Sequence, residues 1–339
     1  MKLNFYILCV ALAAVSAGFS SCSDGDDDVT DRTELQLPAD VQRVKIGAEN
    51  RIALPIINGA GNYNAYSLNP EIAEVTADEN GQLYIEGYKN GITDIVVSDQ
   101  NCTYKRIPVS VYTTDILQLS YDLHVFTMRM GTSETFAECE VTLGNGGYSI
   151  QSDNAKVTPT IDAETGEIVI TATAGKDQID ANVTVTDCSG ISGIIKITVV
   201  PTFEAFTDEE IVELCGKTVH DVNLNGTQPS YFRYMMNGST RYGSMIEEST
   251  DSTEKFGFYY YYAYGTYIRE YSTLISYPSG TPIGVETDGV MRFAQGSDAK
   301  DYAGKVIVHV DNEEKRVATW YNIDYEAEKI DRGYVVYIK

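Results

Sequence analysis

Tyrosine is the residue type with the clearest binding chemistry in this 339-residue sequence, and 16 of its 25 tyrosines lie within residues 202–339. The densest stretch is Phe256-Gly-Phe-Tyr-Tyr-Tyr-Tyr-Ala-Tyr264. Rigid amphipathic rings can stack on sugar faces or anchor a partner, while their hydroxyls form hydrogen bonds. The candidate contact residues are Tyr259, Tyr260, Tyr261, Tyr262, Tyr264, Tyr267 and Trp320.

A structural role for the same rings stays open. Alternate residues of a β-strand face opposite sides, so Tyr260, Tyr262 and Tyr264 would share one face with Phe256 and Phe258, and Tyr259 and Tyr261 would share the other. In the alternative to ligand binding, these rings form core and cross-strand aromatic pairs. The exposure of the tyrosines distinguishes the two interpretations.

The sequence carries no catalytic or metal-binding motif. Its three histidines, His124, His220 and His309, are scattered, and no HExxH, GxSxG, Walker-type or EF-hand spacing occurs. Carboxylate pairs such as Glu247-Glu248 adjoin predicted turns, where we expect them to be solvated. We therefore predict no enzyme activity, no catalytic residue, no metal and no cofactor. A Ser-His or Cys-His pair assembled in space is the remaining alternative.

Cysteine use leaves the disulfide pairing open. Besides Cys22, the exported part contains Cys102, Cys139, Cys188 and Cys215, which allow three pairings. Strand alternation places Cys139 with apolar neighbours, so a buried thiol is the alternative to a bridge. No CxxC spacing occurs, which argues against redox chemistry.

The charge is strongly negative throughout. The sequence has 25 Lys and Arg against 49 Asp and Glu, a net charge of −24, and every predicted segment after residue 22 is acidic. Nucleic acid and anionic membrane surfaces would be repelled, so neither is a predicted partner.

The N-terminus predicts export. Residues 1–21 combine Lys2, an apolar stretch from Phe5 to Val15 and small residues, which is typical of a signal peptide. Residues 22–34 are rich in aspartate and predict a flexible acidic tether. Cys22 lies at the junction of the two segments. One interpretation of Cys22 is a cysteine that happens to lie beside an ordinary cleavage site.

These residues resemble those of a known class of exported proteins. Phe19-Ser-Ser-Cys22 resembles the lipobox of bacterial lipoproteins, and the acidic run after it resembles the surface-export signal of Bacteroidota lipoproteins. The resemblance implies a lipid such as palmitate on Cys22, an outer-membrane anchor and display on the extracellular side. One acyl chain anchors only marginally, so the family's multiple acylation would matter for stable attachment.

An internal repeat organises the middle of the chain. Tyr63, Ser67, Asn69 and Gly81 recur 85 positions later, and Asp99 is matched by Asp187. Each copy contains short alternating runs with turn residues between them, which predicts about seven strands in a β-sandwich. The predicted copies span 35–112 and 113–201.

The two copies resemble bacterial immunoglobulin-like domains. The resemblance rests on Tyr63, on Asn69-Pro-Glu-Ile-Ala-Glu-Val75 and on Gly91-Ile-Thr-Asp-Ile95. It implies modules that act as spacers, stalks or adhesive units, and it assigns no chemistry by itself.

A third unit is predicted over 202–339. Thr207-Asp-Glu-Glu210 forms a capping box that predicts one short helix. Predicted hairpins follow, with Tyr231 to Met236 leading to an Asn-Gly turn, Ile283 to Glu286 leading to an Asp288-Gly289 turn, and a pair joined by residues 312–315. The expected fold class is all-β, with two tandem sandwiches and a C-terminal antiparallel meander of seven or eight strands, closed as a barrel or split as a sandwich.

One modification site is also a candidate. Asp251-Ser252-Thr253 resembles the short O-glycosylation signal of Bacteroidota and lies in a polar stretch. The resemblance implies a sugar on Ser252, and an unmodified loop is the alternative.

Together these features predict a non-catalytic surface lipoprotein whose C-terminal β-domain binds carbohydrate. The alternative is a structural or adhesive protein that recognises another surface protein or belongs to a surface assembly. The order of tether, repeated spacers and aromatic domain motivates the first hypothesis.

Overall fold

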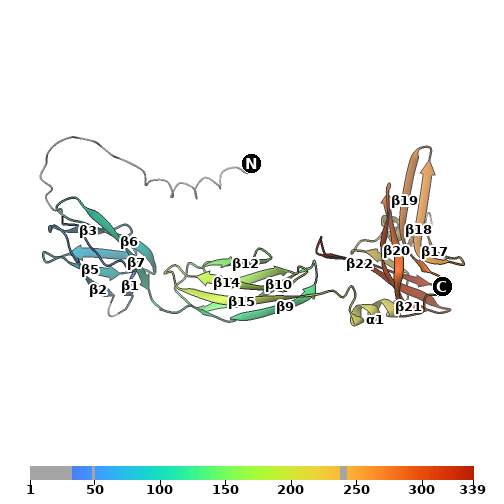
Figure 1. Cartoon of the computed structure of the whole chain (residues 1–339), viewed down its shortest axis with the longest axis horizontal. Helices are drawn as coiled ribbons and strands as arrows, with labels where there is room; N and C mark the ends of the chain where they lie inside the picture. Colours follow the sequence, from blue (N-terminus) through green and yellow to red (C-terminus); the bar gives the residue numbers. More distant parts are fainter. Residues whose placement is uncertain (1–32, 48–49, 237–242) are drawn as a thin grey trace.

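The computed structural model describes residues 33–47, 50–236 and 243–339. The signal peptide, Cys22 and almost all of the tether lie outside these residues, as does the predicted Asn237-Gly238 turn. In the described part the chain is all-β, and three β-units follow one another along the long axis (Figure 1). Neither described helix has the length and apolar character of a membrane span.

The first unit is an Ig-like β-sandwich. Its two sheets have the orders β1-β7-β6-β3 and β2-β5-β4, and β1 pairs with β7 in parallel. Leu83, Ile85 and Ile95 are fully buried between the sheets. The strands are β1 (Gln42–Lys45), β2 (Arg51–Pro55), β3 (Asn64–Ser67), β4 (Ala73–Ala77), β5 (Gln82–Gly87), β6 (Gly91–Ser98) and β7 (Tyr104–Tyr112).

The second unit repeats this arrangement. Its sheets have the orders β12-β13-β10-β8 and β11-β14-β15-β9, with β9 parallel to β15 as β1 is to β7. The predicted tandem sandwiches are therefore confirmed. The strands are β8 (Gln118–Leu119), β9 (Leu123–Arg129), β10 (Ser133–Leu143), β11 (Ser149–Ser152), β12 (Val157–Ile161), β13 (Glu167–Thr173), β14 (Ile179–Thr186) and β15 (Ser192–Thr202).

The repeated residues have matching structural roles. The Tyr63 ring lies between Gly59 and Gly81, where an added Cβ would come within 2.8 Å and 3.1 Å of ring carbons. Tyr148 packs in the same way between the two glycines 85 positions later. A side chain at either glycine would displace the ring, so this spacing is a packing requirement.

The matched aspartates hold equivalent turns. Buried Asp99 accepts hydrogen bonds through Oδ1 from the backbone N–H groups of Asn101 and Thr103, at 3.0 and 3.1 Å. Asp187 accepts the corresponding pair from Ser189 and Ile191, both at 2.9 Å. Because buried N–H groups must be paired, each carboxylate fixes its turn.

A polar network joins the two sandwiches. The side chain of Asn145 accepts from the backbone N–H groups of Thr113 and Thr114 at 2.9 and 3.0 Å, and it donates to Thr114 O and to Asp187. The Ser189 hydroxyl donates to the carbonyl of Val111 at 2.6 Å. These bonds tie the segment between the sandwiches to the second one, so it does not behave as a free linker.

A second network joins the second sandwich to the C-terminal unit. Glu210 lies in helix α1 (Asp208–Gly216) and closes the predicted capping box with Thr207. The same carboxylate accepts from Arg129 of β9 at 3.0 Å and from Arg332 at 2.7 Å. Burial alone would raise the pKa of Glu210, but the Arg332 and Thr207 hydrogen bonds hold it below its ordinary value.

The C-terminal unit is one eight-stranded antiparallel sheet with the order β16-β23-β22-β21-β20-β19-β18-β17. The predicted meander is confirmed, and among the described residues its edge strands, β16 and β17, are not hydrogen-bonded to each other. The sheet is therefore open rather than a hydrogen-bonded barrel. The strands are β16 (Asp221–Leu224), β17 (Ser244–Ser249), β18 (Thr253–Tyr264), β19 (Tyr267–Pro278), β20 (Glu286–Gly296), β21 (Asp298–Asp311), β22 (Lys315–Asp324) and β23 (Lys329–Ile338).

Two predicted hairpins of this unit are wrong. Residues Tyr231 to Met236 lie in a second short helix, α2 (Ser230–Met236), because Tyr231, Phe232 and Met235 pack against the core at helical spacing. Asp288 and Gly289 lie inside β20, paired with Lys305 and Gly304, rather than at a turn. In both places tertiary packing overrides the local turn signal.

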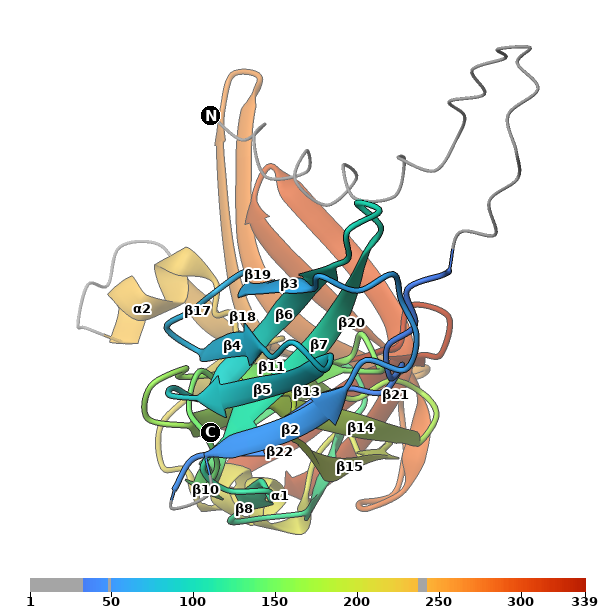
Figure 2. The same cartoon turned by 90° about the vertical axis from the view of Figure 1, so that its left-hand side faces the viewer.

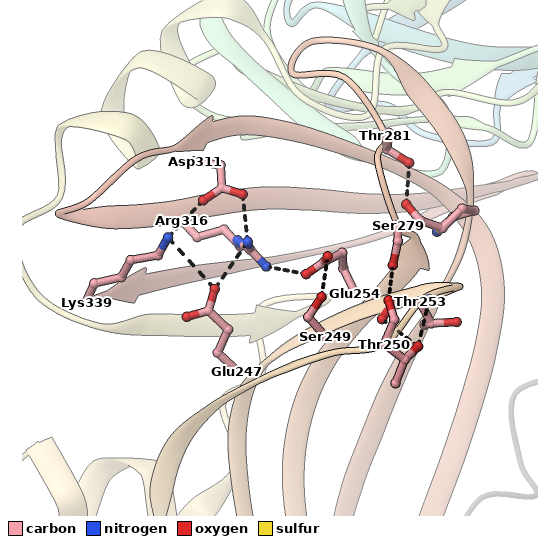
Figure 3. Close-up of polar contacts among 11 residues, drawn as sticks. Glu247, Ser249, Thr250, Thr253, Glu254, Ser279, Thr281, Asp311, Arg316 and Lys339 are labelled. Carbon is pink, nitrogen blue, oxygen red and sulfur yellow. Dashed lines mark hydrogen bonds and ion pairs between the residues drawn. The ribbon is translucent and has the colours of Figure 1, made fainter.

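The sheet curves so that strands from its two halves meet across the core (Figure 3). Arg316 of β22 is 8% exposed and forms ion pairs with Asp311 at 2.7 Å, with Glu254 of β18 at 3.1 Å and with Glu247 of β17 at 3.2 Å. Lys339 adds a contact of 3.0 Å to Asp311. Glu247 is exposed, as predicted, and its contact with Arg316 is an addition that the sequence did not predict. We call these five residues the Arg316 cluster.

Candidate functional site

The hairpin of β18 and β19 extends beyond the rest of the C-terminal sheet (Figure 2). Its tip consists of residues 261–269. On one side β17 begins opposite Tyr259, and on the other β20 ends opposite Glu270. Within the described residues, the tip strands therefore pair only with each other, and a two-stranded ribbon of this kind leaves both faces open.

Exposure changes abruptly where the neighbouring strands end. Tyr261, Tyr262, Tyr264 and Tyr267 are 51%, 41%, 76% and 48% exposed. Ile268 is also exposed. Exposed large apolar groups that cluster in this way are typical of a contact surface rather than of ordinary surface composition.

One face of the hairpin carries a continuous series of aromatic rings. Tyr262 meets Tyr267 edge to face at 6.2 Å, and the guanidinium of Arg269 lies 4.9 Å above the Tyr267 ring. Arg269 also donates to the Tyr271 hydroxyl at 3.1 Å, and Tyr271 lies 5.8 Å from Tyr260. The series thus links the exposed tip to the core, and these contacts hold the tip rings in place.

Two of the sequence candidates are core residues. Tyr260 is 6% exposed because α2 places the Tyr231 ring 4.5 Å from it. Trp320 is fully buried on the inner face of β22, where a Cβ on Gly304 would lie 2.6 Å from its Nε1. Neither ring can reach a ligand, so both are withdrawn as contact candidates. Tyr259 is half-buried on the outer face.

The outer face of the sheet holds a groove that sequence reasoning missed. Its floor is a row of small side chains paired across three strands, Ser276, Val290 and Ala303. One wall is the row Asp288, Lys305 and Tyr321, and the other contains Arg292 and Asp301. We call this feature the outer groove; it comprises two adjoining hollows of about 710 and 550 Å³ that share Val290.

Ion pairs hold the walls of the outer groove. Arg292 binds Glu270 with two hydrogen bonds of 2.8 and 2.9 Å and Asp301 with a third of 2.9 Å. The Arg292 hydrogen bonds lower the pKa of the Glu270 carboxyl. Bidentate guanidinium–carboxylate pairing of this kind fixes both side chains.

The second wall is similarly paired. Lys305 contacts Asp288 at 2.8 Å, and the Tyr321 hydroxyl donates to Glu286. Burial, together with the Glu286 contact, raises the pKa of Tyr321 to about 12. The hydroxyl therefore stays protonated, and its hydrogen bond to Glu286 holds the ring beside the groove. The available sequence signal was a small residue with a charged residue two positions away on either side, as Val290 has Asp288 and Arg292 and Ala303 has Asp301 and Lys305.

The histidines do not form a catalytic arrangement in the described residues. His124 stacks on Phe136 at 3.8 Å, His220 accepts from the backbone N–H of Ile338, and His309 contacts the buried hydroxyl of Thr319 at 2.8 Å. Burial lowers the pKa of each of the three. No group of three or more metal-ligating side chains is arranged to hold an ion in this part of the chain.

The remaining candidates have defined surroundings. Cys139 is buried, as one alternative predicted, and the four described cysteines, Cys102, Cys139, Cys188 and Cys215, are all free thiols. Ser252 is exposed in the turn between β17 and β18, and O-glycosylation there stays a prediction.

Comparisons with known proteins give no family for this chain. No family model matches it, and no curated protein matches it. Among solved structures, domains 5–6 of the S-layer protein SbsC are 16% identical, covering 50% of this chain and 99% of that one, with a TM-score of 0.20.

Two cadherin structures are also similar. Domains EC21-23 of human CDH23 are 12% identical, covering 90% of this chain and 98% of that one, with a TM-score of 0.22. Domains EC22-24 of mouse cadherin-23 are 9% identical, covering 91% of this chain and 97% of that one, with a TM-score of 0.24. All three scores are well below the level at which two chains share an overall fold, and no conclusion about function follows from them.

Proposed function

We propose that this chain is a non-catalytic, cell-surface protein whose C-terminal unit binds carbohydrate. In this proposal residues 35–112 and 113–201 form a stem, and residues 202–339 form the binding unit. One observation carries it: the β18–β19 hairpin presents four exposed tyrosines beyond the edge of the sheet. The polar networks at both junctions support a stem that holds this hairpin at a fixed distance.

The chemistry of the hairpin tip favours a sugar ligand. A pyranose ring offers an apolar face to an aromatic ring and hydroxyl groups at its edge, and tyrosine matches both. Residues 261–269 contain Arg269 and no carboxylate, in a chain with a net charge of −24. The tip therefore presents neither the acidic repulsion nor the acidic hydrogen-bond acceptors of the rest of the surface.

Attachment to the outer membrane through a lipid on Cys22 is part of the proposal. Cys22→Ser is expected to release the protein from the membrane fraction and to abolish metabolic fatty-acid labelling, because the thiol is the acceptor. Cys102→Ser, which removes an exposed free thiol, is the control and should change neither readout. Firm attachment of the Cys22 variant would contradict the anchor, and protease shaving of intact cells tests the extracellular side.

Replacing two exposed tyrosines of the hairpin tip is expected to weaken glycan binding. In the purified full chain, the double variant Tyr264→Ala, Tyr267→Ala is expected to bind a glycan array at least about tenfold more weakly, since aromatic anchors dominate such contacts. The matched control is Tyr66→Ala, Tyr104→Ala, which removes two comparably exposed tyrosines from the first sandwich. Equal binding by the two double variants would contradict the hairpin site.

A protein partner is the second candidate function. It is favoured by the backbone edges of the tip, which no described strand covers and which another chain could pair with. Binding to a host or bacterial surface protein, with no response on the glycan array, would favour this alternative.

A further inference from the structure

We propose that the outer groove is a separate subsite that holds an extended, uncharged polysaccharide chain running across the strands. This inference rests on the carbohydrate-binding function proposed above and adds a site and a ligand class to it. The groove lies on the outer face of β19 to β22, whereas the aromatic series of the hairpin continues from the inner face.

The register of the strands gives the groove its shape. The floor residues Ser276, Val290 and Ala303 are directly paired, so the floor runs perpendicular to the strands. Asp288 and Arg292 lie two residues to either side of Val290 on β20, which places the walls about 13 Å apart. A trough of this width across several strands suits a chain of sugar units better than a single sugar.

The lining has the mixed character that sugars require. Val290 and Ala303 and the ring of Tyr321 offer apolar surface, while Lys305, Asp288 and Arg292 line the edges with donors and acceptors. Ligand sites commonly combine apolar walls with a few polar groups that fix orientation.

The charges of the lining argue against a polyanion as the ligand. Arg292 is paired with Glu270 and Asp301, and Lys305 with Asp288 and Glu286, so these carboxylates outnumber the cations. The walls therefore keep no free cation for a polyanion, and the net charge of −24 would repel one. Side chains already held by one another also lose little freedom when a ligand arrives.

The groove is also continuous with the base of the hairpin. The hollow beside Arg292 is lined by Tyr259, which shares the outer face with Tyr261. Tyr259 of β18 is in register with Ala294 of β20, and Tyr321 of β22 with Asp288, so the two rings lie on opposite sides of the floor as well as four strand spacings apart. A polymer that crosses the groove obliquely, from the Tyr321 side of the floor to the Tyr259 side, would meet an aromatic ring toward each end.

Titration calorimetry of the full chain tests the inference. The probes are a neutral β-glucan, a neutral α-glucan, their short oligosaccharides and the polyanion polygalacturonate. We expect a neutral glucan to bind, with affinity rising with chain length, and polygalacturonate not to bind. Lys305→Ala and the floor-filling Ala303→Leu are each expected to weaken binding about tenfold.

Matched controls separate the groove from general effects. Lys105→Ala removes a similarly exposed paired lysine, and Ala137→Leu adds the same bulk to an exposed strand alanine of the second sandwich. Neither should alter binding. Thermal unfolding of every variant checks that the fold is kept.

The outcomes distinguish this inference from the function on which it rests. If the wild type binds a neutral glucan and only the hairpin variant loses affinity, the groove is not a subsite and the proposed function stands. If no neutral glucan binds, the groove inference fails, and the proposed function then stands or falls with the glycan array. Binding of polygalacturonate through the groove would overturn the assignment to uncharged chains.

Discussion

Replacing Arg316 with Met is expected to lower the free energy of unfolding of the C-terminal unit by about 3–5 kcal/mol. The variant removes the central cation of the Arg316 cluster and leaves three partly buried carboxylates facing one another, with only Lys339 nearby. Trp320 is the single tryptophan of the chain and is fully buried in the same unit. Its fluorescence during urea unfolding therefore reports this unit alone.

The size of this effect should depend on pH. Burial alone would raise the pKa of Asp311, but its hydrogen bonds with Arg316 and Lys339 lower it below the ordinary value. A carboxyl whose pKa is lowered by folding contributes stability above its unfolded pKa and loses it as pH falls through the folded value. The difference between wild type and variant should therefore shrink at acidic pH.

A surface ion pair provides the control for this measurement. Lys305→Ala breaks contacts with Asp288 and Glu286, whose side chains are 89% and 44% exposed. Such pairs contribute about 0–1 kcal/mol, so the control should unfold almost as the wild type does. If Arg316→Met lowered the free energy of unfolding no more than Lys305→Ala does, the Arg316 cluster would not hold the curved sheet together.

Replacing Asn145 with Ala is expected to destabilise the junction of the two sandwiches by roughly 2–4 kcal/mol, since buried polar groups lose their partners. The change leaves the N–H groups of Thr113 and Thr114 and one oxygen of Asp187 without the amide they contact. We expect hydrogen exchange at Thr113 and Thr114 to become faster. We also expect X-ray scattering to show a broader range of particle dimensions.

The first sandwich supplies the matched control for Asn145. Asn62→Gly removes an exposed side chain that donates to Gln100 at 3.0 Å, and glycine accepts the left-handed backbone at this position, where φ is 50°. Water replaces this hydrogen bond readily, so the hydrogen-exchange rates at Thr113 and Thr114 should not change. If Asn145→Ala left those rates unchanged as well, the segment between the sandwiches would be held by other contacts, and the rigid stem would lose its main support.

The stem and the tip of the hairpin are expected to differ in rigidity. Buried, fully paired groups at Asn145 and Asp187 restrict motion between the sandwiches. The tip of the hairpin, by contrast, has no neighbouring strand among the described residues and is held by ring contacts such as that between Tyr262 and Tyr267. Local opening is therefore expected first at the tip, where a ligand would contact it.

Much of the fold follows from local spacing. The 85-residue shift predicted two copies of one unit, and Tyr63 and Tyr148 occupy the same position in each, where a side chain on either flanking glycine would crowd the ring. Thr207 and Glu210 predicted the start of α1, since both halves of a capping box lie within four residues. By contrast, the helix at Tyr231 and the strand through Asp288 depend on packing partners far along the chain.

The candidate site, like the fold, was only partly predictable from the sequence. Strand alternation alone determined that Tyr260, Tyr262 and Tyr264 share a face, because side-chain direction has a period of two residues. Only the tertiary structure decided that Tyr260 is core while Tyr262 is exposed: β17, β20 and α2 cover the hairpin as far as Tyr260 and no farther. Burial is set by neighbours distant in sequence, and for the same reason the outer groove exists only once β19, β20 and β21 are placed in register.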